Sequence, residues 1–540
     1  MRTAVASSPI RQEVVVSGTL GVLVSTLIVA AVPAGGDAAA HLYRTLLVHS
    51  GTFVWDNLWF SGQYPLASYS FLYYLLANAV GNLPLGVAAV IATAVLFAVL
   101  AVGEWGRAAR WPARIFAVLC GGQLFTGAYD YTVGFAMLLA TLVALQRGRN
   151  RWAMVGTVAT IAISPLAFLF LCVVLAAIWI PRHRLTWGAG RIAATLGVCA
   201  TSELALQHVF PSPGMYYPFG TWRLLVILAV SALGIAVALQ SRERMGSLAS
   251  LFFVWALTSI AAAEVPSPVG HNVTRISTAV LPLMLLASTL AGFRPRWLVT
   301  LALAGATAIA VGPYLSMIPQ RTSATGSTAA YWEPAISFLH THSPPEFRVE
   351  VVPTANHWEA YYLPKGGIEL ARGWYRQLDI ADNPALYQPT LTAAAYRRWL
   401  RGVAVKYVVV TDLQPAAMGA PREAALVSSG RAGLRRVYAS HAFTIYELRH
   451  ATPILTGRSP AELTSVGHLA ISGWNAQPGS YTLRIHYLPY WQSTSGACVV
   501  PAAGGMSRLV LRTAGRFTLH IDASIVTLAD KVLDNHAGHC

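Results

Sequence analysis

The sequence predicts a polytopic α-helical membrane domain followed by an extracytoplasmic soluble domain of α+β or β-sandwich type. Only 11% of the 540 residues are charged and 55% are hydrophobic, whereas a soluble protein carries about 25% charged residues. Apolar runs separated by short basic stretches recur throughout residues 1–322, which is typical of repeated membrane crossings. Within residues 323–540, apolar and polar residues alternate between turn signals, as they do in half-buried strands.

About eleven membrane spans are expected within residues 1–322, since a helix needs about 17 to 25 apolar residues to cross a bilayer. The first, 14–33, follows Arg2 and Arg11 and is interpreted as an uncleaved signal-anchor. Two pairs of short spans are expected to form hairpins, 113–127 with 131–146 and 154–163 with 165–180, and the second hairpin is expected to bend at Ser164 and Pro165. The other spans are expected at 85–104, 192–207, 224–240, 248–263, 276–291 and 298–315.

Arginine-rich turns follow alternate spans and predict the topology. They lie at 107–114, 147–151, 181–184, 241–244 and 293–296. The positive-inside rule puts these turns and the N-terminus in the cytoplasm and the C-terminal domain outside. We therefore expect a multi-pass protein of the plasma (inner) membrane, surrounded by membrane lipid. The net charge of +16 does not indicate a nucleic-acid partner, because these arginines act as topology signals and no nucleic-acid motif accompanies them.

The segment 34–83 is expected to form the first outer loop and to carry the chemistry, ending in a helix at 68–81 on the outer leaflet. It opens with Asp37 at a membrane boundary, where a carboxylate is costly to desolvate and is often functional. His41 follows four residues later, so the two side chains would share a helix face. Three interpretations stay open for Asp37: a general base with a raised pKa, a ligand with His41 for a divalent cation such as Mg or Mn, and a helix N-cap.

Aromatic and acidic residues crowd the rest of this loop. Asp56, Trp59 and Tyr64 are candidates for binding a substrate sugar, because an acid can hydrogen-bond sugar hydroxyls beside stacking rings. The alternative is an ordinary loop at the interface between lipid and water, where aromatic side chains are common.

Two later outer loops hold further candidates. Asn272 and Arg275 lie in PSPVGHNVTRI, just before a span. An arginine there can hold a phosphate through two parallel hydrogen bonds, which suits a lipid-phosphate donor; snorkelling to lipid headgroups is the alternative. Tyr217 could line the same cavity from the other loop. Asp130, near a span end, is interpreted as a turn residue.

The C-terminal domain contains a cluster of aromatic, basic and acidic residues in HWEAYYLPKGGIELARGWYRQLD. Arg372 and Trp374 of this stretch could bind carbohydrate, or could belong to a structural polar network. Helices are expected at 332–339 and 393–400. Cys498 and Cys540 could pair if the domain is extracytoplasmic. The sequence has no P-loop, zinc-protease or nucleophile-elbow motif, so it does not indicate any of the soluble enzyme classes that these motifs define.

The chain resembles the polytopic type C (GT-C) glycosyltransferases that use polyprenyl-phosphate sugars. The resemblance rests on GGDAAAH directly after the first span, on the aromatic loop ending in YP and on the surface helix that follows. More closely, the chain is similar to a group of bacterial membrane proteins labelled as related to 6-pyruvoyl-tetrahydropterin synthase, through WFSGQYP, VGHNVTRI, ELARGWYRQLD, YRRWL, VKYVVV, LPYWQ and GGMSRL. The resemblance implies that an acid of the first outer loop, here Asp37, is the catalytic base. A synthase of that name would need zinc-binding histidines, and the sequence has no convincing cluster of them.

The leading hypothesis is an integral membrane glycosyltransferase. It would move a sugar from a polyprenyl-phosphate donor to a cell-envelope glycan or lipid acceptor, with Asp37 as the base and Arg275 on the leaving phosphate. No cofactor is required by this hypothesis, although a divalent cation stays open. The alternative is a transporter or flippase of a polyprenyl-linked envelope lipid. A non-catalytic scaffold ranks last, because an anchor does not need so many spans.

Overall fold

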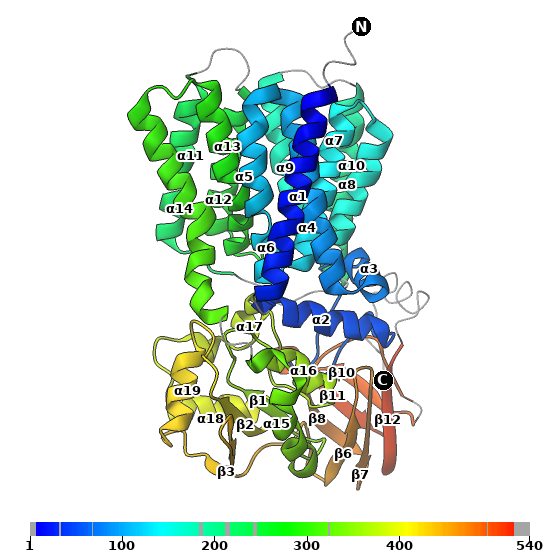
Figure 1. Ribbon diagram of the computed structural model, residues 1–540. Helices are drawn as coiled ribbons and strands as arrows, with labels where there is room; N and C mark the ends of the chain where they lie inside the picture. Colours follow the sequence, from blue (N-terminus) through cyan, green and yellow to red (C-terminus); the bar gives the residue numbers. More distant parts are fainter. Residues whose placement is uncertain are drawn as a thin grey trace. The chain divides into compact units, whose positions relative to one another are not determined.

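The computed structural model describes residues 7–31, 34–66, 69–182, 187–210, 217–240, 246–321, 325–493 and 495–522 (Figure 1). The chain divides into two compact units. The first, here called the helical unit, comprises Met1–His41, Tyr69–Leu206 and Gly214–Thr322. The second, here called the C-terminal unit, comprises Leu42–Ser68, Gln207–Pro213 and Ser323–Cys540. The segment predicted as the first outer loop is therefore divided between the two units.

Helices make up the helical unit, with short 3-10 turns between some of them (Figure 1). In chain order they are α1 (Ser7–Ala31), the beginning of α2 (Gly36–His49), α3 (Leu72–Val80), α4 (Asn82–Trp105), η1 (Gly106–Ala109), α5 (Arg110–Leu119), α6 (Gly122–Thr126), α7 (Tyr129–Gln146), α8 (Asn150–Ile163), α9 (Pro165–Trp179), η2 (Ile180–Arg182), most of α10 (Trp187–Val209), α11 (Thr221–Ala238), α12 (Gly246–Glu264), η3 (Gly270–Ile276), α13 (Ser277–Leu290) and α14 (Arg296–Arg321). Each predicted span overlaps one or two of these elements.

Seven helical stretches among the described residues are long and apolar enough to cross a membrane. They are Ile10–Ala31, Asn82–Thr126, Tyr129–Gln146, Thr221–Ala238, Gly246–Glu264, Gly270–Leu290 and Arg296–Ile318. The stretch Asn82–Thr126 is 45 residues long and contains α4, η1, α5 and α6. Pro165–Trp179 is apolar but shorter. The prediction of repeated membrane-type helices is confirmed, whereas the count of about eleven and the orientation stay predictions.

The bend predicted in the second hairpin is confirmed. Ser164 has extended backbone angles, φ −155° and ψ 107°, so it separates α8 from α9. Its hydroxyl accepts a hydrogen bond from the N–H of Ala167, which caps α9. Pro165 is the first residue of α9, where its missing N–H is not needed.

Several helix ends that border the arginine-rich turns contact one another in pairs. Glu13 of α1 forms ion pairs with Arg110 and Arg114, so the beginning of α5 is held beside the first turns of α1. The beginning of α10 packs against the beginning of α8, and the beginning of α12 packs against Pro181 after α9. The beginning of α1 is thus paired with that of α5, the beginning of α8 with that of α10, and the end of α9 with the beginning of α12, which agrees with the positive-inside rule. That these helix ends are cytoplasmic stays a prediction.

A mixed sheet forms the first half of the C-terminal unit. Its strands are β1 (Arg348–Val351), β2 (Val405–Thr411), β3 (Arg435–Ala439) and β4 (Phe443–Glu447), in the order β1-β2-β4-β3. β1 is parallel to β2 and the other pairs are antiparallel. The helices of this half are α15 (Ala329–His342), α16 (Glu359–Lys365), α17 (Arg376–Asp382), α18 (Ala393–Gly402) and α19 (Ala420–Ser428). The helices predicted at 332–339 and 393–400 are confirmed as α15 and α18.

Two antiparallel sheets form the second half of the C-terminal unit. The strands are β5 (Leu455–Thr456), β6 (Ala461–Val466), β7 (Ala470–Asn475), β8 (Gly479–His486), β9 (Trp491–Ser493), β10 (Cys498–Pro501), β11 (Met506–Leu511) and β12 (Gly515–Ile521). The sheet orders are β10-β11-β8-β5 and β6-β7-β12-β9. Leu483 and Leu509 of one sheet share a buried apolar core with Ile471 and Leu519 of the other, as in a β-sandwich. The predicted β-rich C-terminal region is confirmed, and its extracytoplasmic placement stays a prediction.

Three cysteines within the described residues are free: Cys120, Cys172 and Cys199. Cys540, the predicted partner of Cys498, lies outside the described residues. That pairing therefore stays a prediction.

Candidate functional site

An acid and an arginine predicted to act together meet in the helical unit. Asp37 is the second residue of α2, and its Oδ2 accepts a 2.7 Å hydrogen bond from Nη2 of Arg275 in η3. The Asp37 side chain is 29% exposed and the Arg275 side chain 26% exposed. A ligand can therefore reach the pair, and neither charge is sealed in the protein interior.

The backbone around Asp37 explains its position. Gly127 ends α6 in the left-handed conformation, with φ +78°. A Cβ at Gly127 would lie 2.7 Å from the backbone nitrogen of Ala38, so the turn after α6 approaches the first turn of α2 as closely as glycine allows. A carboxylate in the first turn of a helix is also favoured by the helix dipole. Asp37 thus belongs to a well-packed helix start whose side chain turns to Arg275.

Three neighbours hold Arg275 in place. Its Nε donates a 3.2 Å hydrogen bond to Oδ1 of Asn272, the second residue predicted to bind phosphate. Its guanidinium lies 5.9 Å from the ring centroid of Tyr131, within the range of a cation–π contact. Its carbonyl oxygen accepts a 3.2 Å hydrogen bond from Nε2 of Gln123. Backbone and side chain are therefore both anchored beside Asp37.

The pKa of Asp37 shifts in the direction opposite to the one considered from the sequence. Burial, the largest single influence, raises the pKa of this carboxyl, but the charge and hydrogen bond of Arg275 together with the charge of His41 lower it by more. The net result is a pKa below the ordinary value. Asp37 is therefore ionised at neutral pH and can accept a proton once Arg275 has another anion to bind.

His41 forms a second pair, with Asp130, and both of these side chains are buried. Its Nε2 lies 3.2 Å from Oδ1 of Asp130, and its Nδ1 lies 3.0 Å from the hydroxyl of Tyr74. Asp130 is buried in the first turn of α7 and is not an exposed turn residue, so its interpretation from the sequence was wrong. An acid at the start of a span, like Asp37 just after one, was the signal that could have identified it.

The cation interpretation of Asp37 and His41 finds no support in this arrangement. Both ring nitrogens of His41 have polar partners, and Oδ2 of Asp37 binds Arg275. Within the described ranges, no three His, Cys, Asp or Glu side chains lie close enough together to hold a metal ion. The side chains that a divalent cation would need are engaged with each other or with arginine.

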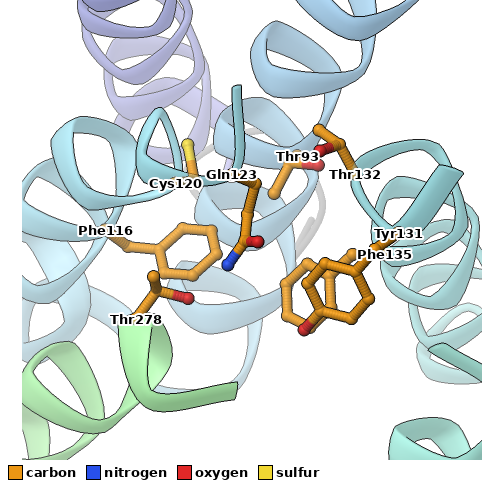
Figure 2. A pocket seen from close by; sticks show the side chains of 8 residues that line it. All are labelled: Thr93, Phe116, Cys120, Gln123, Tyr131, Thr132, Phe135 and Thr278. Carbon is orange, nitrogen blue, oxygen red and sulfur yellow. The ribbon is translucent and has the colours of Figure 1, made fainter. Parts of the chain in front are cut away.

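A small pocket lies next to Arg275 inside the helical unit (Figure 2). Gln123 and Tyr131, which contact Arg275, also line it. The Thr93 hydroxyl on its wall is buried without a hydrogen-bond partner, which suits a bound water. The space admits about one water molecule and is too small for a sugar or a prenyl chain. The lining residues are Thr93, Phe116, Cys120, Gln123, Tyr131, Thr132, Phe135 and Thr278.

Tyr217, predicted to line the same cavity, packs on a different residue of η3. Its ring meets the His271 ring edge-on at 5.3 Å between centroids, and His271 is also hydrogen-bonded to Arg223. Gly270 makes this possible, because a side chain there would collide with the backbone carbonyl of Tyr217. Tyr217 therefore braces the turn that carries Arg275.

The aromatic part of the predicted loop belongs to the C-terminal unit and is buried there. Asp56 is fully buried, and its carboxylate accepts hydrogen bonds from the Tyr43 hydroxyl at 2.9 Å and the Leu58 N–H at 3.2 Å. His468 lies 2.8 Å from the same carboxylate. Asp56 itself has no exposed surface and all three partners belong to the C-terminal unit, so it has the environment of a structural acid.

Trp59 and Tyr64 are also packed within the C-terminal unit. Trp59 stacks on Tyr43 at 4.3 Å between centroids and donates a hydrogen bond to the carbonyl of Ala360. Tyr64 packs edge-on against Trp55 and Phe210, beside the core of the sandwich. Burial raises the pKa of Tyr64 above its ordinary value. Because the Trp59 ring is completely buried, a sugar cannot stack on it in this conformation.

Arg372 lies in a buried network of acids. Its guanidinium forms ion pairs with Glu350, Glu423 and Asp379. Trp374 stacks on the ring of His357 at 3.2 Å between centroids. The structural alternative considered for this stretch therefore describes Arg372 better than carbohydrate binding does.

Sequence comparisons leave the family open: no protein-family model and no curated protein matches the chain. The resemblance to type C glycosyltransferases therefore stays a prediction.

Proposed function

We propose that the protein is an integral membrane glycosyltransferase that moves a sugar from a polyprenyl-phosphate donor to a glycan or lipid of the cell envelope. The observation that carries the proposal is the ion pair between Asp37 and Arg275. It joins a carboxylate able to accept a proton with a guanidinium able to hold a phosphate. Arg275 lies near the beginning of the membrane-type stretch Gly270–Leu290, and Asp37 follows the stretch Ile10–Ala31 by six residues. Both side chains are more than a quarter exposed, so both can be reached from solvent.

The pair suggests how donor binding prepares the base. A donor phosphate would compete with Asp37 for the Arg275 guanidinium, which can form two parallel hydrogen bonds to phosphate oxygens. Asp37 would then lose the interaction that lowers its pKa, and its affinity for a proton would rise. Asn272 would hold the arginine in position, as it does through its 3.2 Å hydrogen bond.

Transfer then follows from the same two charges. Asp37 takes the proton of the acceptor hydroxyl as the acceptor oxygen forms a bond to the anomeric carbon. The bond between that carbon and the phosphate oxygen breaks with inversion, and the polyprenyl phosphate leaves with the electron pair. Arg275 stabilises the charge that builds up on the leaving phosphate, where electrostatic help is largest.

The buried pair of His41 and Asp130 would position Asp37. His41 lies one turn after Asp37 on α2, so its contacts with Asp130 and Tyr74 fix the rotation of this helix about its axis. A fixed helix start keeps the carboxylate within hydrogen-bond distance of Arg275. The contacts of His41 would thereby hold the reactive carboxylate in a fixed position, as a catalytic group requires.

The test is sugar transfer by Asp37→Asn in proteoliposomes, with a panel of polyprenyl-phosphate hexoses and pentoses as donors. Asparagine keeps the size of the side chain and can still accept a hydrogen bond from Arg275, so folding should persist. We expect transfer to fall about 10²- to 10⁴-fold, the range for losing a general base. Glu104→Gln, an exposed acid at the end of α4, is the matched control and should transfer normally. Normal turnover by Asp37→Asn would contradict the proposal.

A second candidate function, a flippase of a polyprenyl-linked lipid, is favoured by the buried His41–Asp130 pair. Such pairs inside helical membrane proteins often relay protons in transporters. The flippase predicts that Asp130→Asn stops lipid movement between leaflets while no lipid gains or loses a sugar. The transferase predicts that the acceptor gains the mass of one sugar residue.

A further inference from the structure

One face of the sandwich carries an exposed tryptophan. In β7, burial alternates along the strand: Ile471, Gly473 and Asn475 are buried, whereas the Trp474 residue is 40% exposed. Trp474 is the one exposed large hydrophobic side chain among the described residues of the two sandwich sheets. Leaving an indole in water costs free energy in proportion to its apolar area. The Trp474 indole is therefore available to a ligand.

The strand register surrounds this tryptophan with charges of both signs. Glu462 on β6 lies directly opposite Trp474 on one side, and Arg516 on β12 lies directly opposite on the other. Both flanking residues are exposed, so all three side chains point outward from the same face. Directly paired side chains in neighbouring strands lie about 5 Å apart. The row is therefore an aromatic ring between a carboxylate and a guanidinium.

The same face continues with uncharged polar side chains. The next row along the strands is Ser465, Ser472 and Thr518, and the hydroxyls of the last two lie 3.2 Å apart. One row further on, His520 pairs with Gln492 of β9. Two residues of strand advance about 6.6 Å, so three rows span about 13 Å. A ring, then hydroxyls, then an imidazole and an amide lie along one flat face.

We propose that this face of the sheet β6-β7-β12-β9 binds a neutral oligosaccharide. The C–H face of a sugar ring is weakly positive and packs on the electron-rich face of an indole. Neighbouring sugar hydroxyls both donate and accept, which matches Glu462 on one side of Trp474 and Arg516 on the other. The opposite charges cancel, so the face favours a neutral glycan over an anionic one.

Binding to a membrane surface fits the face less well. Helices and sheets that insert into a bilayer present several apolar side chains together, usually with a basic rim. Trp474 stands alone among polar neighbours, and one of its two charged neighbours is acidic. The glycan-binding face goes beyond the proposed transfer, because it would bind a glycan whether or not sugar transfer takes place elsewhere in the chain.

The experiment is binding of the purified full-length protein in lipid nanodiscs to an array of neutral and acidic oligosaccharides. We expect binding to neutral members, and a loss of affinity of about tenfold or more in Trp474→Ala, as for an aromatic hot spot. Trp474→Phe should retain part of the affinity, because it keeps a ring. Trp152→Ala, which removes another strongly exposed tryptophan in α8, is the matched control and should bind like the wild type.

Three results would overturn the inference. One is the absence of wild-type binding to every neutral glycan, and another is equal affinity in Trp474→Ala and Trp152→Ala. The third is binding only to anionic lipid vesicles, which would assign the face to a membrane. Sugar transfer by Trp474→Ala should also be measured at saturating acceptor and is expected to match the wild type. This separates failure of the glycan-binding face from failure of the proposed transfer.

Discussion

Two arginine–carboxylate groups in this protein are built from the same chemistry and differ in access to solvent. Arg275 has one acidic partner, Asp37, and both side chains are more than a quarter exposed. Arg372 has three acidic partners, Glu350, Asp379 and Glu423, and its side chain is 5% exposed. The first arginine can exchange its partner for a ligand. The second cannot leave its partners without stranding three carboxylates in the protein interior.

Residue type alone does not identify a functional arginine. Both arginines are candidates from the sequence, because arginine near aromatics and acids suits phosphate and carbohydrate alike. The number of buried partners separates them. An arginine with a single reachable partner is available for binding, and an arginine enclosed by acids is part of the fold.

The largest expected effect on stability is that of Arg372→Met. It removes the positive charge from a buried site and leaves Glu350, Asp379 and Glu423 unpaired, so we expect the local free energy of unfolding to fall by about 3–5 kcal/mol. Hydrogen exchange of the β2 amides in the full-length protein measures it. Arg422→Ala, an exposed arginine in α19, should change the same exchange by no more than about 0.5 kcal/mol. Equal effects of the two variants would contradict the structural role of Arg372.

A smaller effect is expected from pH, because buried acids of the C-terminal unit have raised pKa values. Burial raises the pKa of Glu369 to about 7, even though Arg348 next to it lowers it. Burial and the charge of Asp379 raise the pKa of Asp382 to about 7. Both acids bind protons more tightly in the folded state. Their stabilisation is complete below the unfolded-state pKa values and is lost as the pH rises through about 7.

Hydrogen exchange between pH 5 and 8, corrected for intrinsic rates, tests this pH dependence. The difference between 4.5 and about 7 for Glu369 corresponds to about 3 kcal/mol. Glu369→Gln should remove that part of the pH dependence, since glutamine stays neutral and can still accept a hydrogen bond from Arg348. A wild-type unit that gains stability as the pH rises from 5 to 8 would refute the assignment.

The smallest expected effect on stability is that of Arg275→Met. The pair with Asp37 is partly exposed, so its loss should lower the free energy of unfolding of the helical unit by only about 1 kcal/mol. The same variant should lose affinity for a polyprenyl phosphate, because no guanidinium is left to hold the phosphate. Thermal unfolding and binding to nanodiscs loaded with the lipid separate the two effects. A large loss of stability with unchanged lipid binding would make Arg275 a structural residue like Arg372.

The sequence predicted much of the architecture because the signals were local. Apolar length placed the helices, Ser164 and Pro165 marked the break between α8 and α9, and alternation placed β2 and β8. Asp37 and His41, which would share a face if their segment were helical, do lie on one helix. Each of these features depends on a few neighbouring residues, so it can be recognised without knowing the tertiary structure.

The rest depends on contacts between distant residues. Asp37 and Arg275 are 238 residues apart in the sequence, and Trp59 and its partner Ala360 are 301 apart. No local pattern tells whether an aromatic residue such as Trp59 will be buried or will face a ligand. Trp474 illustrates the converse, since its exposure follows only from which face of β7 turns outward. Burial is a property of the whole fold, and these assignments needed the structure.

The most direct test of Arg275 as the phosphate-binding residue is a structure of the full-length protein in nanodiscs containing a polyprenyl phosphate. We expect phosphate density within hydrogen-bond distance of Arg275, with the Asp37 carboxylate released from the guanidinium and facing the phosphate. Phosphate bound elsewhere, with the 2.7 Å contact between Asp37 and Arg275 unchanged, would contradict it. A lipid lying in a passage open to both leaflets would instead favour the flippase.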